Sequence, residues 1–247
     1  MGQAAGGMAE VVCAMPNIKV AGSGGATVDA YLAAPSEGSG PWPGVVVVHD
    51  IFGLTRHARD HVDRLASYGY VAVAPDLYTR GGMARCVVAT LRSMMSGEGK
   101  PYEELETVRV WLTQREDCTD RVGIIGFCMG GGFALMTASR GFDVAAPNYG
   151  NLPKDLSVLD GACPVVGSYG GKDFALRGAA AKLESALAAR NIPRDIKEYP
   201  GAGHSFLDHF PVGPLAPLAR VTGLGYNQPA ADDAWQRIED FFAEHLR

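Results

Sequence analysis

Gly126-Phe127-Cys128-Met129-Gly130 follows directly on an apolar run, Arg121-Val122-Gly123-Ile124-Ile125. The apolar run predicts a buried strand and the chain after Met129 predicts a helix, so a sharp turn joins the two. Glycine is needed on both sides of this turn, because side chains there would collide with the neighbouring strand and helix. The turn holds Cys128 at a helix N-terminus, where the dipole and free N–H groups favour a thiolate over a thiol. The alternative is a buried structural cysteine on a glycine-rich turn.

Two further residues stand after predicted strands, in the order that such a turn requires. A nucleophile on a strand–turn–helix elbow is typical of α/β-hydrolases, in which an acid and then a histidine follow it along the chain. Residues 163–169 predict a strand that leads to Asp173, and residues 195–199 predict one that leads to His204. Catalytic groups of open α/β sheets gather at the carboxyl ends of strands, so we expect the three side chains to meet. Taken singly, Asp173 is explained by turn formation and His204 by a surface loop.

Strand and helix patterns alternate along the chain. The expected strands cover residues 27–33, 44–49, 71–74, 121–125, 144–146, 165–168 and 195–199, and the expected helices cover residues 57–68, 102–115, 129–139, 178–189 and 232–246. This alternation predicts an α/β fold, with a mostly parallel sheet flanked by helices on both faces. We expect a flexible tail over residues 1–14 and one domain over residues 15–247, without a large lid domain.

Composition and charge argue against several other classes of protein. The chain has 247 residues, is 47% hydrophobic and carries a net charge of −5, which fits one globular core and offers no basic face for nucleic acid. The longest purely aliphatic run, Val45 to Val48, is too short to span a membrane. The cysteines are odd in number and lack metal-site or disulfide spacing, which indicates a reducing cytoplasm. They are Cys13, Cys86, Cys118, Cys128 and Cys163. We expect a monomer that binds neither nucleic acid nor a membrane.

The motifs together resemble the dienelactone hydrolase family. The resemblance rests on Gly-Phe-Cys-Met-Gly-Gly at 126–131, Gly-His-Ser-Phe at 203–206, and the stretches at 49–54, 75–80 and 148–150. It extends from about Thr27 to the C-terminus and implies the α/β-hydrolase fold. It also implies hydrolysis of small cyclic enol-lactones and related activated esters, without a cofactor or a metal.

The resemblance further implies a role for each site residue. Cys128 is the nucleophile, His204 the base and acid, and Asp173 the group that orients His204. A histidine with a near-neutral pKa can take the thiol proton and return one to the leaving oxygen, and a carboxylate on its other nitrogen fixes the tautomer. The backbone N–H groups of Met129 and Ile51 are expected to form the oxyanion hole.

Departures from the family pattern concern substrate binding and the resting thiol. Asp50 stands where the family carries a glutamate that interacts with the thiol, and Arg80 matches an arginine that binds a substrate carboxylate. A second family arginine is replaced by Asp208, so we expect weakened selectivity for dicarboxylate-like lactones. Tyr149 is expected to line the pocket or its rim.

Three other patterns receive structural interpretations. His57 and His61 have the i, i+4 spacing of helical zinc ligands, but no glutamate follows the first and no third ligand is evident, so a solvated helix face is favoured. Gly171-Lys172 precedes aspartate rather than Ser or Thr and is no phosphate loop. The glycine-rich run at 22–25 precedes a strand and is expected to be a flexible turn.

Other functions remain open at this point. Cys128 could serve a redox or electrophile sensor, with Cys163 approaching it as a resolving thiol. A non-catalytic binding module on the hydrolase fold is disfavoured, because such a module has no physical need for all three catalytic residues. Within the hydrolases, thioesterase or carboxylesterase activity is the nearest alternative to lactone hydrolysis.

Overall fold

The computed structural model describes residues 17–21, 27–209 and 225–247. Its strands are β1 (Ile18–Ala21), β2 (Thr27–Ala33), β3 (Trp42–Val48), β4 (Val71–Pro75), β5 (Cys118–Phe127), β6 (Val144–Asn148), β7 (Val165–Gly170) and β8 (Arg194–Tyr199). They form one sheet in the order β1-β2-β4-β3-β5-β6-β7-β8. β2 pairs antiparallel with β1 and β4, and all later neighbours are parallel. The expected mostly parallel sheet is confirmed.

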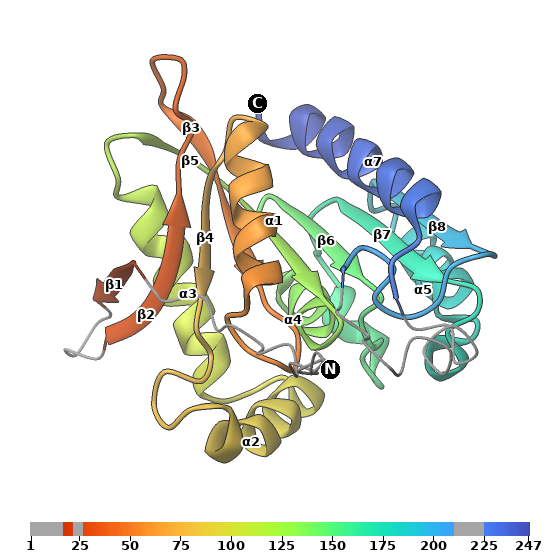
Figure 1. The fold of residues 1–247 in the computed structure, drawn as a ribbon. Helices are drawn as coiled ribbons and strands as arrows, with labels where there is room; N and C mark the ends of the chain where they lie inside the picture. The colour runs from red at the N-terminus through yellow and green to blue at the C-terminus, as the bar shows by residue number, and fades with distance from the viewer. Residues whose placement is uncertain (1–16, 22–26, 210–224) are drawn as a thin grey trace, which may run out of the picture.

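Helices cover both faces of the sheet (Figure 1). They are α1 (Arg56–Ser67), α2 (Met83–Ser96), α3 (Lys100–Thr113), α4 (Met129–Thr137), α5 (Ala179–Ala188) and α7 (Gln228–Leu246), with short 3-10 helices η1 (Leu156–Leu159) and η2 (Phe174–Leu176). α1 and α7 lie on one face and α3, α4 and α5 on the other, whereas α2 packs on α3 and α4 rather than on the sheet. Within the described ranges there is no separate lid domain.

The core is made where these layers meet. Val45 to Val48 of β3 are fully buried, as expected for an aliphatic strand that helices cover on both sides. The last helix turns one apolar stripe inward: Trp235, Ile238, Phe242 and Leu246 are at most 3% exposed. Burial of both sheet faces fixes the register of the strands, and with it the places where their carboxyl ends stop.

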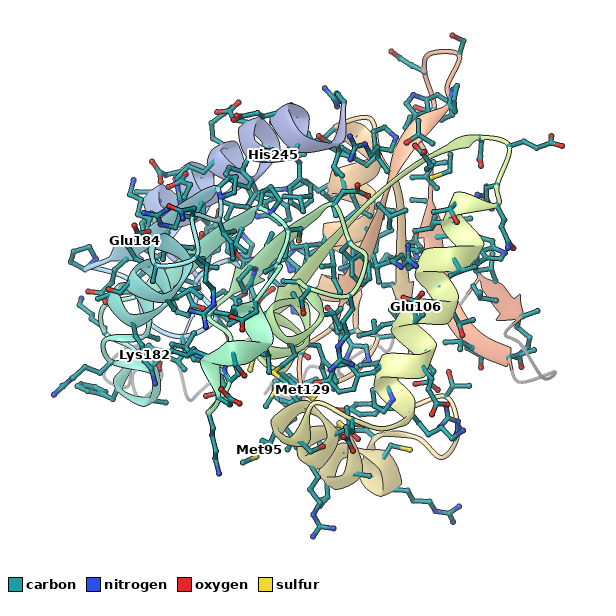
Figure 2. The ribbon with its side chains drawn as sticks, turned by 180° about the vertical axis from the view of Figure 1, so that it is seen from behind. Met95, Glu106, Met129, Lys182, Glu184 and His245 are labelled. Atoms are coloured by element: carbon teal, nitrogen blue, oxygen red, sulfur yellow. The ribbon has the colours of Figure 1, made fainter. Side chains whose placement is uncertain are left out.

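One strand and one α-helix were not expected from the sequence. β1 is a four-residue edge strand, too short to give a clear alternation. α2 lies between Gly82 and Gly97, both with positive φ, and only Thr90 and Met94 of its residues are buried. Val87 and Leu91 pack against the core beside them, so the inward stripe of α2 keeps helical spacing but is only partly buried. Figure 2 shows Met95 of α2 at the outer surface.

Some expectations fall outside the described ranges. These are the tail over residues 1–14, Cys13 and the glycine-rich run at 22–25. Among the described residues, no helix has the length and apolar composition needed to cross a membrane.

Candidate functional site

The turn after β5 has the geometry expected of a nucleophile elbow. Cys128 has φ 54° and ψ −114°, a strained conformation for a residue with a side chain. A Cβ on Gly126 would lie 1.9 Å from the carbonyl oxygen of Gly130, and a Cβ on Gly130 would lie 2.0 Å from that of Val48. The two glycines therefore allow the first turn of α4 to pack directly on the ends of β5 and β3. This packing holds Cys128 between strand and helix.

The loop after β7 supplies a buried carboxylate. Asp173 is 4% exposed, and its Oδ1 accepts a hydrogen bond from the N–H of Ala175, at the start of η2. Its Oδ2 lies 2.6 Å from Nδ1 of His204, in the loop after β8. Since an ionised carboxylate only accepts hydrogen bonds, Nδ1 of His204 carries the proton and donates it. Nε2 is thereby left as the nitrogen available to a partner on the other side.

That partner is Cys128. Burial alone lowers the pKa of His204, but hydrogen bonds to Asp173 and Cys128 and the charges of both groups outweigh it and raise the pKa to about 10. Both partners therefore favour the charged form of His204, and its pKa lies above the near-neutral value that we expected. The three side chains thus lie together: His204 is hydrogen-bonded to Asp173 and is close enough to Cys128 for the thiol to shift its pKa.

The sheet register explains why residues so far apart in sequence meet. Phe127 on β5 is level with Asn148 on β6, and Asn148 is level with Ser168 on β7. The N–H of Cys128 donates to the carbonyl of Asn148, at 3.1 Å. The parallel strands therefore end side by side, and the loops that follow them share one edge of the sheet.

The loop after β3 lies at the same edge. Asp50 is 8% exposed, and its Oδ1 accepts a hydrogen bond from the N–H of Phe52 at 2.7 Å. Burial raises its pKa to about 6, so Asp50 titrates close to neutrality. The carbonyl of Ile51 accepts a hydrogen bond from the Tyr78 hydroxyl, at 2.9 Å. Met129 opens α4, and first-turn N–H groups have no acceptor within their helix.

Asp208 differs from the substrate-facing carboxylate that its position suggested. It is 3% exposed and accepts hydrogen bonds from Nε2 of His61 at 2.8 Å and from the Tyr149 hydroxyl at 2.6 Å. Burial would raise its pKa, but the hydrogen bonds to these groups and the charge of His61 hold it below the ordinary value. Tyr149 is also fully buried, so it does not line the rim; its ring packs edge-on against that of His204, with centroids 5.3 Å apart.

His61 is not on a solvated helix face, and that expectation is wrong. It is 7% exposed and its ring stacks on Phe127 at 3.9 Å, directly before the nucleophile. The sequence does hold the signal, because His61 falls three residues after Ala58 and four before Leu65 on the buried stripe of α1. We term Asp208, His61 and Tyr149 the Asp208 brace.

The Arg80 guanidinium forms an ion pair with a buried carboxylate. Its side chain is 47% exposed, and its guanidinium pairs with Glu104 of α3, whose side chain is 6% exposed. Burial raises the pKa of Glu104 to about 7, although the charge of Arg80 opposes the shift. Sequence reasoning missed Glu104; its position four residues before the buried Val108 places it on the inward stripe of α3.

Cys163 is far from Cys128. The N–H of Cys163 donates to the carbonyl of Ala138, just beyond α4, so this thiol lies at the amino end of β7. Cys163 precedes Ser168 by five residues, or about 16 Å of extended strand, and Ser168 is level with the residue before Cys128. Burial raises the pKa of Cys163 to about 12. This placement contradicts a role as the resolving thiol.

The chain is similar to known proteins along most of its length. Residues 28–246 match the model of the dienelactone hydrolase family. A protein of Yersinia pestis, provisionally named as a carboxymethylenebutenolidase, is 32% identical over 244 residues, covering 90% of this chain and 86% of its own. The carboxymethylenebutenolidase of Rhodococcus opacus is 30% identical over 233 residues, covering 87% and 86%. The crystal structure of a provisionally named dienelactone hydrolase from Klebsiella pneumoniae subsp. pneumoniae has a TM-score of 0.73 at 28% identity, covering 92% of this chain and 97% of the other. The architecture is the α/β-hydrolase fold.

Proposed function

This chain belongs to the dienelactone hydrolase family and is an ester or lactone hydrolase of the carboxymethylenebutenolidase kind, and we propose that Cys128, His204 and Asp173 carry its reaction. The observation that supports this most is the strained elbow that holds Cys128 beside His204, whose other nitrogen is hydrogen-bonded to Asp173. The substrates are small lactones or activated carboxylic esters.

The first half of the reaction forms a thioacyl-enzyme. The Cys128 thiolate attacks the substrate carbonyl carbon, and the carbonyl oxygen becomes an oxyanion that the N–H groups of Met129 and Ile51 stabilise. When the tetrahedral intermediate collapses, the C–O bond breaks and the leaving oxygen takes a proton from Nε2 of His204. A lactone opens at this step, and its new hydroxyl or enol stays attached to the acyl group.

The second half returns the enzyme to its starting state. Neutral His204 takes a proton from water as the water oxygen attacks the thioester carbon, and a second tetrahedral intermediate forms. Its collapse breaks the C–S bond, releases the acid and leaves the thiolate beside the imidazolium. Asp173 stays ionised throughout, holds the tautomer of His204 and stabilises its positive charge.

The proposed chemistry also bears on cofactors, oligomeric state and cellular compartment. Every proton and bond is accounted for by the substrate, water and side chains of one chain, so we propose that no cofactor and no second copy is needed, and the expected monomer stays a prediction. A thiol nucleophile must remain reduced, which favours a reducing compartment such as the cytoplasm. The same steps would also cleave thioesters or other carboxylic esters, so those activities remain the nearest alternative.

Hydrolysis of a dienelactone, followed by its absorbance, tests the proposal. We expect turnover by the native protein and by Cys163→Ala, whose thiol lies far from the site, but none by Cys128→Ala. Turnover that survives in Cys128→Ala would overturn the nucleophile assignment. If the native protein cleaves only other compounds in a parallel panel of esters and thioesters, the lactone class is wrong and the hydrolase mechanism stands.

A further inference from the structure

The His49 side chain, at the end of β3, is fully buried and has two backbone partners. Its Nε2 lies 3.1 Å from the backbone nitrogen of Leu77, which donates to it. Its Nδ1 lies 2.6 Å from the carbonyl oxygen of Asp50. The ring itself is 1% exposed and tilts against the ring of Tyr78.

These two contacts fix the tautomer of His49. Nε2 must present a lone pair, because a proton there would face the N–H of Leu77. The single proton of the neutral ring is therefore on Nδ1, and it is donated to the Asp50 carbonyl. Burial lowers the pKa of His49, and the Asp76 carboxylate stays 4.0 Å from Nε2, so the ring is neutral.

A fixed Asp50 carbonyl fixes the N–H of Ile51. The two groups belong to one planar trans peptide and point in opposite directions, so the peptide cannot turn without breaking the bond to His49. The next carbonyl, that of Ile51, is held by the Tyr78 hydroxyl. Both peptide groups that flank Ile51 are thus anchored by buried side chains.

Hydrogen bonds within this loop engage the two N–H groups that follow Ile51. The N–H of Phe52 is taken by Oδ1 of Asp50, and that of Gly53 points to the Asp50 carbonyl at 3.4 Å. For the N–H of Ile51, the described part of the chain provides no acceptor. A well-anchored donor without a partner is what a developing oxyanion requires.

The loop starts beside the first turn of α4. Val48 is level with Gly126 across the sheet, and a Cβ on Gly130 would lie 2.0 Å from the carbonyl oxygen of Val48 and 2.7 Å from that of His49. The backbone that carries Ile51 therefore emerges next to the turn that carries Cys128.

From this geometry we infer that His49 is a positioning residue for the oxyanion hole: its neutral ring aims the N–H of Ile51 through the Asp50 carbonyl. The inference rests on the proposed function and adds a residue to it. The His49 ring is 1% exposed and bonded to backbone groups, so a substrate does not reach it. Its contribution is made when negative charge develops on the substrate oxygen, so it should lower the barrier of the chemical step and leave substrate binding nearly unchanged.

The test compares His49→Leu, which removes both hydrogen bonds, with His49→Gln, whose amide has a donor and an acceptor. On p-nitrophenyl acetate we expect kcat of His49→Leu to fall about 100-fold with KM nearly unchanged, and His49→Gln to recover much of the loss. Alkylation of Cys128 by iodoacetamide is the control, because it displaces iodide and forms no oxyanion. Its rate should be the same in all three proteins.

Other results would contradict either the positioning role of His49 or the proposed function. Unchanged kcat in His49→Leu, or an alkylation rate that falls with kcat, would sink the positioning role. If His49→Leu does not fold, His49→Gln and the native tautomer decide: nitrogen NMR of labelled histidine should show a neutral ring with the proton on Nδ1, and a proton on Nε2 would contradict the inference. A native protein without ester turnover would instead overturn the proposed function.

Discussion

At the residue scale, the Arg80 guanidinium already has a buried partner in Glu104. A substrate carboxylate would have to compete with this pair, and the family's second arginine position holds the buried Asp208. We therefore expect kcat/KM for a carboxylate-bearing lactone to be no higher than for its neutral methyl ester. Glu104→Gln should free the guanidinium and raise the relative kcat/KM of the charged lactone about fivefold, the usual worth of a partly exposed ion pair. A strong native preference for the charged lactone would contradict this.

Glu104 should also leave a signature in the pH dependence of stability. Its pKa is raised by burial from 4.5 to about 7, so its favourable contribution is complete below pH 4.5 and is lost as the pH rises through 7. Between pH 5 and pH 8, Glu104→Gln should therefore gain about 2–3 kcal/mol in unfolding free energy relative to the native protein. Urea denaturation at both pH values measures this.

Glu103→Gln is the matched control, because this neighbour on α3 is exposed and forms a surface pair with Lys100. Its difference from the native protein should be nearly the same at pH 5 and pH 8. An equal pH response of the two variants would show that burial of Glu104 is not the cause.

Single residues differ in how much the sequence reveals about them. Cys128, Asp173 and His204 follow predicted strands and could be located, because the carboxyl ends of parallel strands meet. The partners of Arg80 and Asp208 could not, because Glu104 and His61 belong to helices whose rotation against the sheet decides which way each polar side chain points. A polar residue within an apolar stripe is a signal of this kind, but it does not name its partner.

At the element scale, the site depends on the close approach of α4 to β3. The Cβ of an alanine at Gly130 would lie 2.0 Å from the Val48 carbonyl oxygen, so Gly130→Ala must push the helix away from the sheet. We expect a loss of at least about 3 kcal/mol in unfolding free energy and loss of ester turnover. Gly201→Ala is the control, since a Cβ there meets only the Asn227 side chain, at 4.0 Å. Native stability in Gly130→Ala would contradict the described packing.

The elements themselves were predictable where burial is regular. β3, β4, β6 and β7 are short apolar runs buried on both faces, and α7 has a single apolar stripe. α2 was not predicted, because it packs on α3 and α4 rather than on the sheet. It also leaves the apolar residues Met83, Val88 and Met95 exposed, which blurs the difference between its two faces. Its glycine boundaries, Gly82 and Gly97, were the available signal.

At the scale of the whole molecule, the Asp208 brace joins three distant segments. It ties α1 through His61 and the end of β6 through Tyr149 to the loop that carries His204, and the Tyr149 ring packs edge-on against His204 at 5.3 Å. Asp208→Asn removes the charge. It also places an amide N–H opposite one of the two groups that donate to Asp208, which are Nε2 of His61 and the Tyr149 hydroxyl. We expect it to cost about 2–4 kcal/mol of unfolding free energy and to lower kcat.

Asp60→Asn, an exposed carboxylate on α1, is the control for the brace and should behave as the native protein does in urea denaturation and turnover. Native values in Asp208→Asn would mean that the brace supports neither fold nor site. The sequence could not reveal this connection, because its members are 59 or more residues from Asp208 and no motif links them.

The most direct measurement for the central claim is the intact mass of the protein, quenched during turnover of p-nitrophenyl acetate. We expect the mass to rise by one acetyl group, peptide mapping to place it on Cys128, and Cys128→Ala to show neither the adduct nor turnover. Two results would contradict nucleophilic catalysis by Cys128. One is steady turnover that persists in Cys128→Ala and gives no thioacyl adduct. The other is an adduct found only on another cysteine, such as Cys86.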